Sequence, residues 1–160
     1  TSILVNGIIT SDGVRHRWNM LLLDGKWYHF DVTWDDCKGG IKLPYGYFGV
    51  TTEEILRSRT IEYVAPIATA TDYNYFTRLK MTTSSNDFEE LKACANNSVA
   101  ITGDCIAIKF DSKADFDTFV ANIGVEGVKL IRVFVPNKGF SWMPALYNDM
   151  YIVQMKWLVT

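Results

Sequence analysis

RHRWNMLLLDGKWYHFDVTWDD, residues 15–36, predicts a β-hairpin and decides how the first half of the chain folds. Asp24-Gly25 stands between two strand-like runs, and this dipeptide is typical of a two-residue type I′ turn. With that turn, paired positions sum to 49. His16 is then expected opposite Thr33, and Trp18 opposite Asp31.

Side chains alternate between the two faces of a strand, so His16, Trp18, Asp31 and Thr33 are expected on one face. His16 and Asp31 become diagonal neighbours, roughly 5 to 8 Å apart. A carboxylate at that separation can reach the imidazole, fix its tautomer and stabilise its charged form. The hairpin therefore predicts two of the three members of a catalytic triad.

His16-Arg17-Trp18-Asn19, followed by Asp31-Val32-Thr33-Trp34-Asp35-Asp36, resembles the transglutaminase-like superfamily, whose core is similar to that of papain-type cysteine proteases. The resemblance covers residues 3–36 closely and residues 45–54 and 68–75 more weakly. It implies that His16 is the general base and acid and that Asp31 orients it. It also makes Trp18, Asn19 and Trp34 candidates for a substrate groove; packing is favoured for Trp18, and both roles stay open for Trp34.

The resemblance implies a cysteine nucleophile on a helix that precedes these strands, and residues 1–14 do not match it. We therefore expect the chain to be the C-terminal part of such an enzyme, without the nucleophile helix and inactive by itself. Cys37 is a weak substitute on a glycine-rich loop. Cys94, on a probable helix face, and Cys105, in a strand-like run, are expected to be structural.

Composition excludes several classes of function. The chain has 160 residues, 48% of them hydrophobic, and its net charge of −2 comes without a basic run, so nucleic acid is not an expected partner. No apolar stretch is long enough to cross a membrane. Two histidines and three cysteines without paired spacing indicate neither a metal site nor a disulfide framework, and no cofactor is expected.

The expected fold class is α+β, with the transglutaminase-like antiparallel sheet in residues 1–70 and a small α-β-α-β-β module in residues 71–160. In the first part we expect a strand at 2–9, a strand at 45–50, a helix opened by a Thr51–Glu54 capping box, and an extended connector at 64–75. In the second part we expect helices at 86–95 and 112–124, strands at 104–110 and 128–135, and a hairpin at 146–158. Residues 139–144 are expected to be a loop that caps the core or, as an alternative, docks a partner.

The resemblance implies acyl transfer from a peptide or protein substrate, either to water or to an amine, in a bacterial protein that is secreted or held in the cell envelope. The rival hypothesis is a non-catalytic binding or assembly module on the same scaffold. Without the nucleophile helix, the face of Trp18, Met20, Leu22 and Trp27 would be bare. We therefore expect self-association, or a retained N-terminal fragment, through that face.

Overall fold

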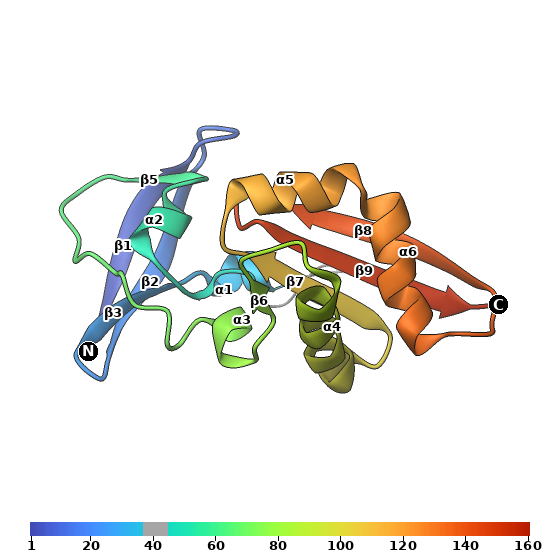
Figure 1. Ribbon diagram of the computed structural model, residues 1–160. Helices are drawn as coiled ribbons and strands as arrows, with labels where there is room; N and C mark the ends of the chain where they lie inside the picture. Colours follow the sequence, from blue (N-terminus) through green and yellow to red (C-terminus); the bar gives the residue numbers. More distant parts are fainter. Residues whose placement is uncertain (37–44) are drawn as a thin grey trace. The chain divides into compact units, whose positions relative to one another are not determined.

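The computed structural model describes residues 1–36 and 45–160, which form two compact units (Figure 1). Unit 1 is Thr1–Arg78 and unit 2 is Leu79–Thr160, each with its own sheet. The fold class is α+β. From the sequence, the boundary between the two parts is predicted after residue 70. In the structure, unit 1 continues to Arg78 and includes the short helix α3 (Tyr75–Arg78).

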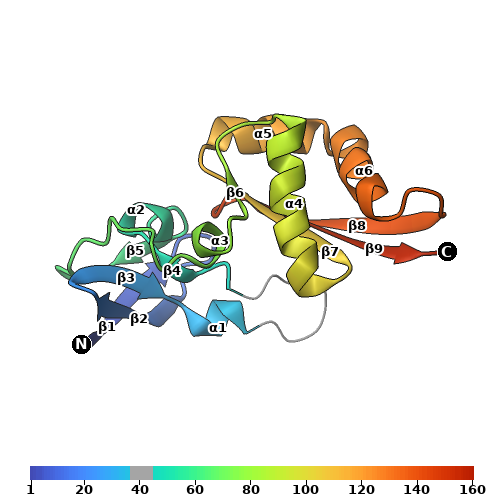
Figure 2. The ribbon, with the colours of Figure 1, turned by 60° about the horizontal axis from the view of Figure 1, so that its bottom comes forward.

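The sheet of unit 1 is antiparallel throughout and has the strand order β4-β3-β2-β1-β5. Its five strands are β1 (Ser2–Ile9), β2 (Arg15–Leu23), β3 (Lys26–Phe30), β4 (Phe48–Val50) and β5 (Arg59–Ile61). The long hairpin of β2 and β3 is its middle, and β1 lies on the other side of β2 (Figure 2). The extended connector expected at residues 64–75 contains no strand and ends in α3.

The hairpin has the register that its turn predicts, but only near the turn. Asp24 and Gly25 have φ angles of 48° and 76°, as a type I′ turn requires, and pairing runs from Leu23↔Lys26 to Asn19↔Phe30. The expected pairing of His16 with Thr33 is wrong, because the chain leaves the sheet after Phe30 and forms a helical turn, α1 (Val32–Asp35).

Two short helices in unit 1 begin at side-chain caps. Asp31 caps α1 by accepting a hydrogen bond from the backbone N–H of Trp34. Thr51 and Glu54 form the predicted capping box at the start of α2 (Thr52–Ile55), so that prediction is confirmed. Both caps satisfy N–H groups that have no partner within the first helical turn.

The sheet face expected to be bare is largely covered, so the premise for self-association is wrong. Trp18 and Met20 are buried, and Leu22 and Trp27 are half-buried. The hydrogen bond between His29 and Thr52 holds α2 against this face. The apolar surface exposed on this face, which was expected to drive self-association, is therefore small.

Gly7 on β1 makes the close packing of Trp18 possible. A Cβ atom at residue 7 would lie 2.0 Å from the carbonyl oxygen of Thr60 and 2.6 Å from the Trp18 ring. A side chain of any size would therefore force β5 or the indole to move.

Unit 2 packs three helices on one face of a sheet with the order β6-β7-β9-β8 (Figures 1 and 2). On the two central strands, β7 and β9, alternate side chains point to the helices. Ile106 and Ile108 lie opposite Met155 and Val153 and form the core together with residues of all three helices. The strands are β6 (Thr82–Thr83), β7 (Cys105–Phe110), β8 (Phe140–Tyr147) and β9 (Ile152–Val159), and the helices are α4 (Phe88–Thr102), α5 (Lys113–Ala121) and α6 (Ile123–Phe134).

The structure corrects two expectations in unit 2. Residues 128–135, expected to be a strand, lie mostly in α6, which buries Leu130 and Ile131. Residues 139–144, expected to be a loop, lie mostly in β8 and pair with β9. The second module therefore runs β-α-β-α-α-β-β, with one more helix than expected and a short parallel pair between β6 and β7.

Candidate functional site

His16 and Asp31 are in direct contact in unit 1. Nε2 of His16 donates a hydrogen bond to Oδ2 of Asp31 over 2.7 Å. The histidine comes from the start of β2, and the aspartate from the residue that caps α1. The side chain of Asp31 is fully buried and that of His16 is 14% exposed, so the imidazole can meet solvent while its partner cannot.

This contact assigns the proton on the His16 ring. An ionised carboxylate only accepts hydrogen bonds, so the Nε2 atom that faces Asp31 carries the hydrogen. In the neutral ring, Nδ1 then holds a free lone pair, and it has no hydrogen-bond partner among the described residues. Nδ1 is therefore the atom at which His16 can accept and return a proton.

Arg59 is a third member of this cluster, and sequence reasoning missed it. Its Nε and Nη2 atoms donate to the same Oδ2 of Asp31, over 3.2 and 2.8 Å. The guanidinium is completely buried, with its carbon 4.2 Å from the ring centre of Tyr47 and 4.8 Å from that of Trp34. The carboxylate of Asp31 therefore accepts hydrogen bonds from both a histidine and an arginine, and the arginine lies against two aromatic rings.

His29 lies next to this cluster but has a structural role. Nε1 of Trp18 donates to its Nδ1 over 2.9 Å, so its hydrogen is on Nε2, which donates to Oγ1 of Thr52 over 3.0 Å. Burial, together with the nearby charge of Arg59, lowers the pKa of His29 to about 4. His29 is therefore neutral near pH 7, and both of its nitrogens are occupied.

Asp35, at the end of α1, is a second perturbed carboxyl group. Burial raises its pKa to about 6, although the backbone N–H of Tyr47 donates to its Oδ1 over 2.8 Å and opposes that shift. Asp35 therefore exchanges its proton in the range where many enzymes work.

The structure brings some of the groove candidates to His16 and not others. Trp18 is 2% exposed and stacks beside the imidazole with the ring centres 6.0 Å apart, so it packs as favoured. Trp34 is 43% exposed, and its ring centre lies 6.3 Å from that of His16. Asn19 is on the opposite face, where it lines a separate apolar hollow of about 310 Å³ with Leu21 and Phe30.

The two thiols that the structure describes, those of Cys94 and Cys105, are buried and have raised pKa values. Burial raises the pKa of Cys94 to about 11 and also raises that of Cys105, so both stay protonated near neutral pH. Both are buried in unit 2, and their expected structural role is confirmed. Cys37, the weak substitute, lies outside the described residues.

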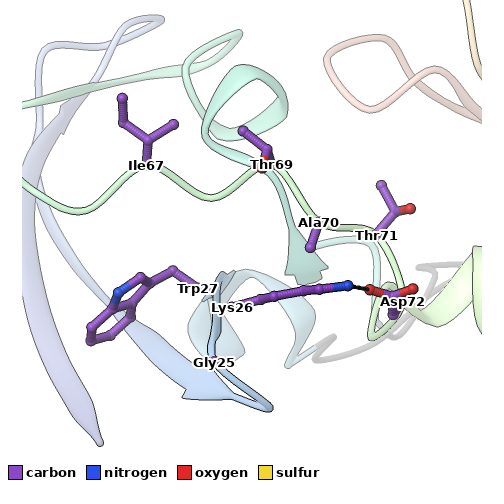
Figure 3. A pocket seen from close by; sticks show the side chains of 8 residues that line it. All are labelled: Gly25, Lys26, Trp27, Ile67, Thr69, Ala70, Thr71 and Asp72. Atoms are coloured by element: carbon purple, nitrogen blue, oxygen red, sulfur yellow. Dashed lines mark hydrogen bonds and ion pairs between the residues drawn. The ribbon is translucent and has the colours of Figure 1, made fainter.

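Two further open hollows flank the hairpin of unit 1. One, of about 510 Å³, lies beside His16 and is lined by Asn6, Gly7, Arg15, His16, Arg17, Thr33 and Glu62. The other, of about 470 Å³, lies at the tip of the hairpin, where Lys26 extends to Asp72 at 2.7 Å and Trp27 is directed away from that pair (Figure 3). Only the first contains a member of the His16–Asp31–Arg59 cluster.

Two absences hold for the described ranges, 1–36 and 45–160. These residues contain no group of three or more histidine, cysteine, aspartate or glutamate side chains that could hold a metal ion. No helix within them is long and apolar enough to cross a bilayer.

No protein-family model matches the chain, and no curated protein matches it significantly.

Proposed function

We propose that unit 1 carries the His–Asp half of a transglutaminase-like cysteine site, which transfers an acyl group from a peptide or protein substrate to water or to an amine. The observation that carries the proposal is the 2.7 Å hydrogen bond from His16 to a buried Asp31, with Nδ1 of His16 left free. The thiol would come from polypeptide outside these 160 residues.

The cluster has the groups that such a reaction needs. Nδ1 of His16 takes the proton of the thiol, the thiolate attacks the acyl carbon, and the imidazolium returns the proton to the leaving amine. Asp31 holds the ring in the required tautomer throughout. A positioned acid and base of this kind contributes roughly 10²- to 10⁴-fold to the rate.

The test is an activity measurement on the chain expressed together with the protein segment encoded upstream of it. Ammonia release and amine incorporation into casein are followed by mass spectrometry for the unmodified protein, His16→Ala, Asp31→Asn, and Lys138→Glu, a control at an exposed residue of unit 2. We expect His16→Ala to reduce turnover at least about 100-fold, Asp31→Asn to reduce it less, and Lys138→Glu to leave it unchanged. Cys37→Ser is a second control and is also expected to keep full activity.

One observation favours a second candidate function, a binding or assembly module on this scaffold. Arg59 makes two hydrogen bonds to Asp31, so part of the negative charge that would stabilise the His16 imidazolium is already neutralised. If turnover is absent, or persists in His16→Ala, the catalytic proposal fails. The cluster then serves to hold α1 against strand β5 of the sheet.

A further inference from the structure

The first half of β2 has a free edge. β2 pairs with β1 from Arg15 to Leu21, but with β3 only from Asn19 to Leu23. Within the described residues, no strand lies beside residues 15–18 on the β3 side, because the chain turns into α1. Such an edge offers unpaired backbone groups to another extended chain.

The hydrogen-bonding direction of each residue on this edge follows from the register. The N–H of Leu22 donates to Thr1 on the β1 side, so His16, Trp18 and Met20 also face β1. The N–H and C=O groups of Arg15 and Arg17 therefore point to the vacant side. No described residue forms a hydrogen bond with either pair of groups.

The hollow beside His16 reaches this edge. It is lined by Arg15, His16 and Arg17 on β2 and by Thr33 on α1, and it extends over the sheet to Asn6 and Gly7 on β1 and to Glu62. Its volume of about 510 Å³ is in the range that binds ligands of a few residues.

The charge of the edge indicates the kind of segment that fits. Arg15 is paired with Glu62 at 3.6 Å, whereas Arg17 is exposed and forms no ion pair with a described residue. A residue opposite Arg17 in an added strand points to the same face, where an acidic side chain would be attracted to the guanidinium. Its neighbours in that strand would then point to the face of His16.

We propose that this edge binds an extended peptide by strand addition, with an Asp or Glu opposite Arg17 and the reacting residue next to it, on the His16 face. The proposal rests on the proposed function, because it names the substrate class of the same site. Main-chain pairing supplies the affinity, and the charge of Arg17 sets the register.

The experiment is an NMR titration of the isotope-labelled 160-residue chain with the acetylated, amidated hexapeptide Thr-Thr-Glu-Gln-Thr-Thr. Three matched probes replace Glu by Lys, or carry an N-methyl group on the Glu nitrogen or on the Gln nitrogen. The Glu nitrogen faces Arg17 in the proposed pairing, whereas the Gln nitrogen faces away. We expect the parent and the N-methyl-Gln peptides to shift the amide signals of Arg15 and Arg17, and the other two peptides to bind at least about tenfold more weakly.

Charge reversal of the protein completes the test. Arg17→Glu is expected to reverse the preference, so that the Lys peptide binds better than the Glu peptide. Lys138→Glu, an exposed change of equal charge in unit 2, is expected to bind as the unmodified chain does. Equal binding of all four peptides, shifts confined to another region, or no shift at about 5 mM peptide would overturn the proposal.

Binding and turnover fail separately in these experiments. The titration needs no nucleophile, so strand addition can hold where the activity assay finds no acyl transfer. A His16-dependent activity without peptide binding at this edge would keep the proposed function and reject the substrate class.

Discussion

Arg59 and Asp31 form a buried ion pair in which each charge depends on the other. Both side chains are completely buried and meet at 2.8 Å. Replacing Arg59 with Met would leave a buried carboxylate with His16 as its main partner. We expect a loss of about 3 to 5 kcal/mol in the free energy of unfolding, measured by urea denaturation followed by circular dichroism.

Two further variants make this measurement specific. Asp31→Asn combined with Arg59→Met removes both charges, and we expect it to recover part of the loss, because no unpaired charge remains. Arg15→Gln removes an 85% exposed side chain from a surface pair and is expected to cost less than about 1 kcal/mol. A loss below that amount for Arg59→Met would show that the pair is not structurally important.

His29 and Asp35 make opposite contributions to stability in weak acid. In the unfolded chain His29 becomes protonated below about pH 6.5, whereas in the folded protein it stays neutral down to about pH 4. The contribution of His29 to stability therefore falls as pH falls. Asp35 takes up its proton near pH 6 when folded and near 3.8 when unfolded, so it adds stability as pH falls. In the unmodified protein the two effects offset each other.

Asp35→Asn separates the two contributions. The variant keeps an oxygen that can accept from Tyr47 but no longer titrates, so only the His29 effect remains. We expect its free energy of unfolding to fall by about 2 kcal/mol relative to the unmodified chain between pH 6.5 and pH 4, because the contribution of Asp35 is lost. Parallel curves for the two proteins, measured by urea denaturation, would contradict the assignment.

At the scale of elements, the contact between β1 and β5 depends on Gly7. We expect Gly7→Ala to lower the stability of unit 1 by about 1 to 3 kcal/mol, because its Cβ would overlap the Thr60 carbonyl and the Trp18 ring. Gly124→Ala in α6 is the control: its Cβ meets nothing within 4 Å, and we expect a gain of about 0.5 to 1 kcal/mol. Thermal unfolding of both variants checks the expected opposite signs.

Local signals in the sequence predict the elements they control. Asp24-Gly25 predicts the register of the hairpin, and Thr51 with Glu54 predicts the start of α2, because each signal acts within a few residues. The same reasoning fails at Thr33, where capping by Asp31 stops the strand. It fails again at residues 128–135, whose β-branched residues suggest a strand while the burial of Leu130 and Ile131 stabilises a helix.

The candidate site likewise contains two residues that local signals predict and one that they do not. The turn at Asp24-Gly25 brings the chain near Asp31 back beside β2, so local signals predict that His16 and Asp31 are close, although Asp31 caps α1 and does not pair in β3. Arg59 reaches Asp31 across 28 positions of sequence, through the pairing of β5 with the far side of β1. No local pattern marks that residue, and only the assembled sheet reveals it.

For the whole molecule, the two units have separate hydrophobic cores. One cluster of buried hydrophobic residues lies entirely in unit 2 and includes Leu130 and Phe119, whereas Val5, Met20 and Ile55 are buried in unit 1. We expect Leu130→Ala to destabilise unit 2 by about 2 to 5 kcal/mol. Hydrogen exchange should show faster exchange in β7 and β9 and unchanged protection in β1 and β2; equal loss in both sheets would contradict separate cores.

The stacking of Trp18 on His16 also has an optical consequence. An imidazolium quenches the emission of a nearby indole more strongly than a neutral imidazole does, and the two ring planes are inclined by only 19°. In a variant that keeps Trp18 and replaces the other four tryptophans with Phe, the fluorescence intensity would report the charge on His16 at pH values well above 4, where His29 stays neutral. The site therefore contains its own spectroscopic probe, which needs neither a substrate nor a label.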